Sequence, residues 1–87
     1  MSHARAVVEV IARTLADHPE HVAITEEQHR GTAVLELYME PGDLGRVIGR
    51  QGRTATALRT LVALAADRDG HRVQLEFRDW PPAGHDQ

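Results

Sequence analysis

Two glycines, Gly49 and Gly52, interrupt an otherwise helical stretch of the chain. Before them, Leu44–Ile48 has the composition of a short helix, and after them Arg53–Asp67 has the apolar spacing of a longer one. Glycine has no side chain that restricts the backbone, so these two positions allow the chain to turn sharply. The sequence therefore predicts two helices joined by a tight turn, rather than one continuous helix.

The segments around these helices have the patterns of strands and of one further helix. Apolar and more polar residues alternate along residues 33–40 and again along Arg72–Arg78, as expected of strands with one buried face. His21–Glu26 is rich in β-branched residues, and Gln28–Gly31 suits a hairpin turn. Apolar residues recur at helical spacing from Ala4 to Leu15, and the proline at position 19 ends that helix.

The resulting order is α-β-β-α-α-β, which predicts an α+β fold with helices packed on one face of a three-stranded sheet. The hairpin makes the first two strands antiparallel, and a right-handed helical crossover makes the second and third parallel, so the sheet is mixed. A chain of 87 residues forms one domain. We place this domain at residues 1–79 and expect residues 80–87 to be a short, flexible tail.

Two local predictions concern the helices. Asp43 follows a Pro-Gly pair and is expected to cap the short helix. The inner stripe of the longer helix is expected to comprise Leu58, Leu61, Val62 and Ala65. Its outer side carries small or apolar residues, which suit either a helix of high propensity or a close helix–helix contact in a dimer. The residues predicted for that contact are Ala57, Thr60, Ala63 and Leu64.

Charge is distributed unevenly along the chain. The net charge is −3 and all ten basic residues are arginine, yet residues 42–60 carry a local charge of +3. Clustered charge alone is often only a solvated surface. Here the basic segment contains the glycine turn, where a polyanion can approach the main chain closely. The helix that follows begins with unpaired N–H groups, which favour phosphate.

These features together predict a site that binds the backbone of a nucleic acid. The arginines hold phosphates at the turn, while two aliphatic residues before it form an apolar wall for bases. The residues predicted for this site are Arg46, Val47, Ile48, Gly49, Arg50, Gln51, Gly52 and Arg53.

The string Val-Ile-Gly-Arg-Gln-Gly at residues 47–52, within this order of elements, resembles a type II KH domain, whose loop binds about four backbone nucleotides. The wider pattern Asp-x-Gly-x-Val-Ile-Gly-x-x-Gly-Arg at residues 43–53 resembles the small bacterial single-KH family of KhpA-like proteins. The resemblance extends to about residue 79. It implies a cytoplasmic protein that binds single-stranded RNA without catalysis, acts as an RNA chaperone or post-transcriptional regulator, and forms a homodimer or a heterodimer with a Jag-type KH protein.

Two positions depart from the family pattern. Thr54 and Ala55 stand where members of this family usually have a large aliphatic residue. The missing volume would loosen the wall behind the turn or change which base fits there.

Other chemistries find less support in the sequence. The chain has no cysteine and no lysine, which excludes a Cys nucleophile, a Cys-ligated zinc site and a Walker-type phosphate loop. The six histidines are scattered without metal-ligand spacing, and no apolar run approaches the length of a membrane span. We therefore expect no enzyme activity, cofactor, metal or membrane partner. One alternative stays open, namely a protein-interaction module that works through the long helix.

Overall fold

The computed structural model describes residues 2–82. Its three helices and three strands follow the predicted order α-β-β-α-α-β, and one-turn 3₁₀ helices lie before β1 and between α2 and α3. The elements are α1 (His3–Leu15), a 3₁₀ turn (Pro19–His21), β1 (Ala23–His29), β2 (Thr32–Met39), α2 (Pro41–Ile48), a second 3₁₀ turn (Arg50–Gly52), α3 (Arg53–Asp69) and β3 (Arg72–Asp79).

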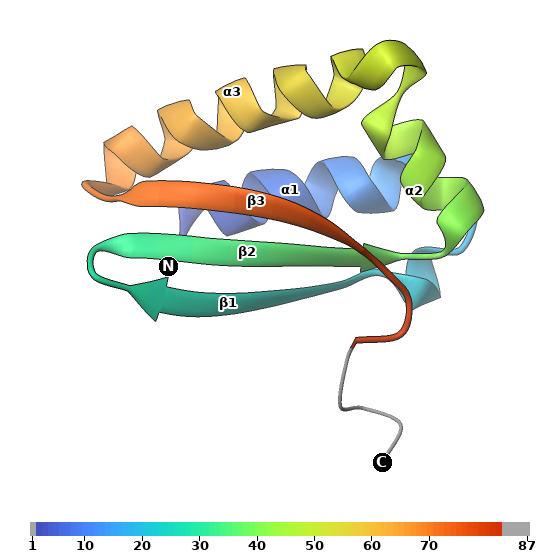
Figure 1. The fold of residues 1–87 in the computed structure, drawn as a ribbon, viewed down its shortest axis with the longest axis horizontal. Coiled ribbons are helices and arrows are strands. Elements are labelled where there is room, and N and C mark those ends of the chain that lie inside the picture. Colours follow the sequence, from blue (N-terminus) through green and yellow to red (C-terminus); the bar gives the residue numbers. More distant parts are fainter. Residues whose placement is uncertain (1, 83–87) are drawn as a thin grey trace.

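The sheet is mixed, which confirms the prediction. Strand β2 lies in the centre, paired antiparallel with β1 and parallel with β3 (Figure 1). The register places Leu35 opposite Leu75, and Leu37 opposite both Ile24 and Phe77. Residues of the three strands that face the helices are therefore aligned across the sheet.

The hairpin between β1 and β2 is tighter than expected. Arg30 and Gly31 both have left-handed backbone conformations, with φ of 50° and 84°. A two-residue turn of this kind matches the twist of the flanking strands. Strand β1 consequently continues to His29, beyond the predicted end at Glu26.

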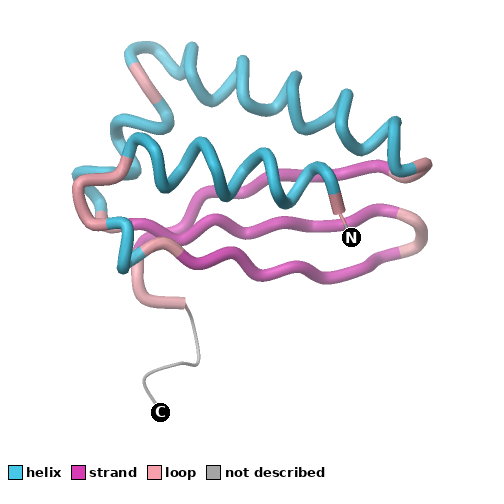
Figure 2. The backbone as a smooth tube through the Cα atoms, turned by 180° about the vertical axis from the view of Figure 1, so that it is seen from behind, coloured by secondary structure: helices cyan, strands magenta, loops and turns pink. Residues whose placement is uncertain are grey.

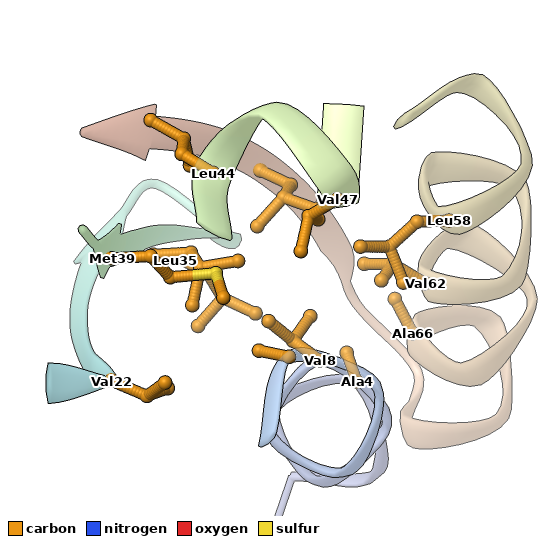
Figure 3. Close-up of a cluster of buried hydrophobic side chains, with 13 residues drawn as sticks. Ala4, Val8, Val22, Leu35, Met39, Leu44, Val47, Leu58, Val62 and Ala66 are labelled. Atoms are coloured by element: carbon orange, nitrogen blue, oxygen red, sulfur yellow. The ribbon is translucent and has the colours of Figure 1, made fainter. Parts of the chain in front are cut away.

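The hydrophobic core lies between the sheet and the three helices, which cover one face (Figure 2). Figure 3 shows side chains of α1, α2 and α3 converging on those of β2. Leu35, Val8, Val47 and Val62 are among the largest fully buried side chains. No helix within residues 2–82 has both the length and the apolar character needed to cross a bilayer.

The inner stripe of α3 differs from the prediction at one position. Leu58 and Val62 are buried and Ala65 packs against the core, but Leu61 is 48% exposed. Successive residues of an α-helix are rotated by about 100°, which places Leu61 at the edge of a stripe centred between Leu58 and Val62. The prediction was therefore wrong for Leu61, which lies on the outer side of the helix.

Asp43 does not cap α2. The helix begins at Pro41 with Glu40 at the N-cap position, so Asp43 lies within the first turn. Its buried carboxylate accepts hydrogen bonds from the backbone N–H groups of Asp17 (3.1 Å) and His18 (2.9 Å). Burial opposes ionisation, but these hydrogen bonds and the nearby His18 side chain hold the pKa of Asp43 below its usual value. Asp43 therefore fixes the chain that leaves α1 against the start of α2.

Trp80 opens the predicted tail and is packed against the domain. Its backbone N–H donates to the Met39 carbonyl at 2.9 Å, and its ring stacks on His21 with centroids 4.9 Å apart. The remainder of the expected flexible tail, from residue 83 onward, lies outside the described residues.

Acid unfolding tests the role of Asp43. A carboxylate whose pKa is lower in the folded state than in the unfolded state favours folding while it is ionised. This contribution is complete above about pH 5 and is lost as the pH falls past the unfolded pKa of about 3.9 and through the lower folded pKa. We expect Asp43→Asn to unfold at a lower urea concentration than wild type at neutral pH, and to lose less stability on acidification.

Asp17→Asn is the matched control, because it removes an exposed carboxylate from the segment that Asp43 fixes. Asp43→Asn should keep part of the pH dependence of stability, because two other carboxylates also have lowered pKa values. Hydrogen bonds from His3 and Gln74 lower the pKa of Asp69 and Glu76, respectively. Urea unfolding at several pH values between about 3 and 7 measures the difference. Identical acid sensitivity of Asp43→Asn and wild type would contradict this role.

Candidate nucleic-acid interface

The turn between α2 and α3 lies at the corner where the two helices meet, at one end of the molecule (Figure 1). Gly49 ends α2 with φ 77° and ψ 171°, and Gly52 precedes α3 with φ 70°. Between them, Gln51 also has a left-handed backbone, with φ 58°. The Gly52 N–H donates to the Gly49 carbonyl at 3.1 Å and closes the turn.

The two glycines are required for different reasons. A Cβ atom added to Gly49 would lie 2.4 Å from Oγ1 of Thr54, so internal packing excludes any side chain there. A Cβ added to Gly52 would meet nothing within 4 Å, so only its left-handed backbone favours glycine. Gly49 therefore serves the fold, whereas the space above Gly52 is open to a ligand.

Three residues close to Gly52 in the sequence carry exposed polar side chains. Arg50, Gln51 and Arg53 are exposed, and Arg53 donates a 2.8 Å hydrogen bond to the Gln51 amide oxygen. No salt bridge within residues 2–82 involves Arg50. No side chain caps the N-terminus of α3, so the N–H groups of its first turn keep the partial positive charge that attracts anions.

The residues before the turn differ from the prediction. Arg46 is exposed, but it forms a 2.7 Å salt bridge with Asp17 and lies 3.5 Å from Asp43, so carboxylates partly neutralise its charge. Val47 is fully buried in the core and its side chain offers no surface to a base. The apolar wall predicted from both aliphatic residues is therefore reduced to Ile48, which is half-buried and packs against the core.

The two positions that depart from the family pattern have defined surroundings. Thr54 lies against Gly49 and fills the space that a side chain at residue 49 would need. Ala55 is 4% exposed and belongs to the buried side of α3. Thr54 therefore packs directly against the Gly49–Gly52 segment, and Ala55 lies on the buried side of α3 next to it.

The structure also brings together a group that sequence reasoning missed. Arg59 on α3 reaches the edge strand β3, where its guanidinium donates to the Leu75 carbonyl at 3.3 Å. The same guanidinium lies 4.9 Å from the centroid of the Phe77 ring. The spacing of seven residues between Gly52 and Arg59 places both on the same side of α3, and this could have been read from the sequence.

The residues predicted for a helix–helix contact all lie on the exposed side of α3. Ala57, Thr60, Ala63 and Leu64 are exposed, and Leu64 retains 62% of its surface. Leu61 joins them and was missed because it was assigned to the core. Apolar side chains thus project into solvent along this helix.

The five histidines within residues 2–82 each lie close to a carboxylate, and His3 and His71 share that of Asp69. Examples are His21 with Glu40 (2.6 Å) and His18 with Asp43 (3.3 Å). Among residues 2–82, no group of three or more His, Asp and Glu side chains is arranged to hold a metal ion.

Comparisons with known proteins agree with this geometry. The model of the KhpA/KhpB KH domain matches residues 5–77. A Halalkalibacterium halodurans protein named RNA-binding protein KhpA is 44% identical over 75 residues, covering 86% of this chain and 99% of that protein. The protein of that name from Aquifex aeolicus is 43% identical over 77 residues, covering 88% and 98%, respectively.

A solved structure shares the fold at low sequence identity. A crystal structure of an Aquifex aeolicus Era variant bound to GDP and aluminium fluoride superimposes with a TM-score of 0.58 and 18% identity, covering 87% of this chain and 29% of that one. This likeness concerns the fold alone. The family match spans most of the domain, and the relatives are matched over nearly their whole length. The chain therefore belongs to the KhpA/KhpB family of KH domains.

Proposed function

We propose that this chain is a non-catalytic protein that binds single-stranded RNA through the turn at Gly49–Gly52. The observation that carries this proposal is the open space above Gly52, which adjoins the uncapped N-terminus of α3. A phosphate can approach the main chain there and accept hydrogen bonds from its N–H groups. The name RNA-binding protein, which the similar KhpA proteins bear, supports RNA as the ligand.

The charges around the turn determine its affinity for the phosphates of RNA. Arg50 and Arg53 can each contact a phosphate, whereas Arg46 is already paired with Asp17. The net charge of −3 provides no long-range attraction for a polyanion. Binding that neutralises two or three phosphates has a slope of log affinity against log salt of roughly −1.4 to −2.1.

A backbone clamp of this kind has weak sequence selectivity, because phosphate contacts position a strand without reading its bases. Such binding suits an RNA chaperone or post-transcriptional regulator that acts on many transcripts in the cytoplasm. Dimerisation adds avidity, since one RNA strand can occupy two clamps.

Reversing the charge of the turn tests this function. We expect Arg50→Asp combined with Gln51→Asp to lower affinity for a mixed pool of single-stranded RNA more than tenfold, because both carboxylates face the phosphates. Fluorescence anisotropy at several salt concentrations measures the affinity and its salt slope, and thermal unfolding checks that the fold is retained.

The matched control is Gln28→Asp combined with Arg30→Asp, which makes the same change in net charge. These residues lie at the β1–β2 hairpin, at the opposite end of the molecule from the turn (Figure 1). Arg30 also has a left-handed backbone, as Gln51 does. Equal loss of binding in both double variants, or no loss in the first, would refute binding at the turn.

A second function is favoured by the apolar residues exposed on α3. Leu61 and Leu64 lie on the same side of the helix as Ala57, at the spacing of a helix–helix contact. We propose that this side of α3 docks against a second copy of the chain or against a Jag-type KH protein. Thr60 suits close packing there, because its hydroxyl already donates to the Thr56 carbonyl.

A charge at Leu64 tests this contact. We expect wild type to exceed its monomer mass of 9.6 kDa in light scattering as concentration rises, and Leu64→Asp to remain monomeric. Val10→Asp on α1 is the control, because Val10 is exposed to a similar extent, at 65% against 62%. A monomeric wild type, or the same association in Leu64→Asp as in wild type, would contradict self-association through α3.

A further inference from the structure

Arg59 occupies a defined place beside the proposed RNA clamp. It lies seven residues after Gly52, which corresponds to about 10.5 Å along the axis of α3. Its side chain spans from α3 to β3, an edge strand whose outer side pairs with no other strand of the sheet. A strand of RNA that is bound at the turn can therefore extend along α3 towards Arg59.

The direct contacts of Arg59 are to uncharged groups, and the charge of Arg59 also contributes, after hydrogen bonds from Gln74 and Arg78, to the lowered pKa of Glu76. Its guanidinium is held by an uncharged carbonyl group, that of Leu75, and by the Phe77 ring. Within residues 2–82, no carboxylate oxygen forms a salt bridge with Arg59, whereas Arg46 has two such neighbours. The ring supports the cation through its negative face and keeps its position fixed.

The three aromatic rings of the chain are engaged within the fold. Tyr38 is buried, Trp80 stacks on His21, and Phe77 lies beneath Arg59. Single-stranded nucleic acids commonly stack their bases on aromatic rings or on the plane of a guanidinium. Near the turn, the guanidinium groups of Arg50, Arg53 and Arg59 are all exposed, and that of Arg59 is the one held over an aromatic ring, Phe77.

We propose that Arg59 stacks a nucleobase of the RNA strand, with Phe77 and Leu75 acting as positioning residues for its guanidinium. This inference rests on the proposed function of the turn. Stacking requires the planar guanidinium, whereas a phosphate contact requires only a positive charge. Arg59→Lys keeps the charge and removes the plane, so it separates the two roles.

The experiment compares two probes of equal length, an oligoadenylate of about ten nucleotides and a chain of abasic ribose phosphates. We expect Arg59→Lys to weaken binding of oligoadenylate at least about fivefold, within the range of one base–side chain stack, and to leave binding of the abasic chain unchanged. Phe77→Leu should weaken oligoadenylate binding in the same selective way. Arg30→Lys at the hairpin is the matched control and should bind both probes as wild type does.

Three results would overturn the assignment. They are wild-type binding of oligoadenylate by Arg59→Lys, an equal loss of affinity for both probes, and a loss of affinity for the abasic chain alone. The double variant at Arg50 and Gln51 separates this failure from failure of the proposed function. If the double variant loses affinity for oligoadenylate and Arg59→Lys does not, the turn binds RNA and only the proposed stacking role of Arg59 is wrong.

Discussion

The close approach of Thr54 to Gly49 is the contact on which the functional end of this molecule depends. A side chain at residue 49 would collide with the Thr54 hydroxyl, and the backbone of Gly49 has a positive φ of 77°, so glycine fits where α2 stops. Because Thr54 lies in the first turn of α3, the same contact fixes where α3 begins. The contact therefore couples the end of α2 to the start of α3.

The core holds this turn from both sides. Val47, in the last turn of α2, and Ala55, in the first turn of α3, are both buried. Their burial anchors the two helices next to the turn, while Arg50 and Gln51 between them stay exposed. A rigid frame of this kind lowers the entropic cost of binding, because the main-chain N–H groups are already positioned.

The sequence predicts the elements and the turn well, because these depend on local patterns. The alternation along β2 and along β3 is a local signal, and so is the pair of glycines. Each of these signals is contained within a few residues of the sequence. The contacts of charged residues depend instead on distant parts of the chain. Arg46 pairs with Asp17, and Asp43 accepts hydrogen bonds from the segment after α1, and no local pattern indicates either contact. Val47 lies three residues after Leu44, and both are buried, so the helical spacing of apolar residues in α2 does indicate the burial of Val47.

The proposed function requires that RNA contacts the main chain of residues 49–53 and the start of α3. Nuclear magnetic resonance of the backbone amides during titration with single-stranded RNA tests it directly. We expect the largest shifts at Gly49–Arg53 and in the first turn of α3, with little change at the β1–β2 hairpin. Shifts concentrated at that hairpin or on α1, with the amides of the turn unchanged, would contradict it.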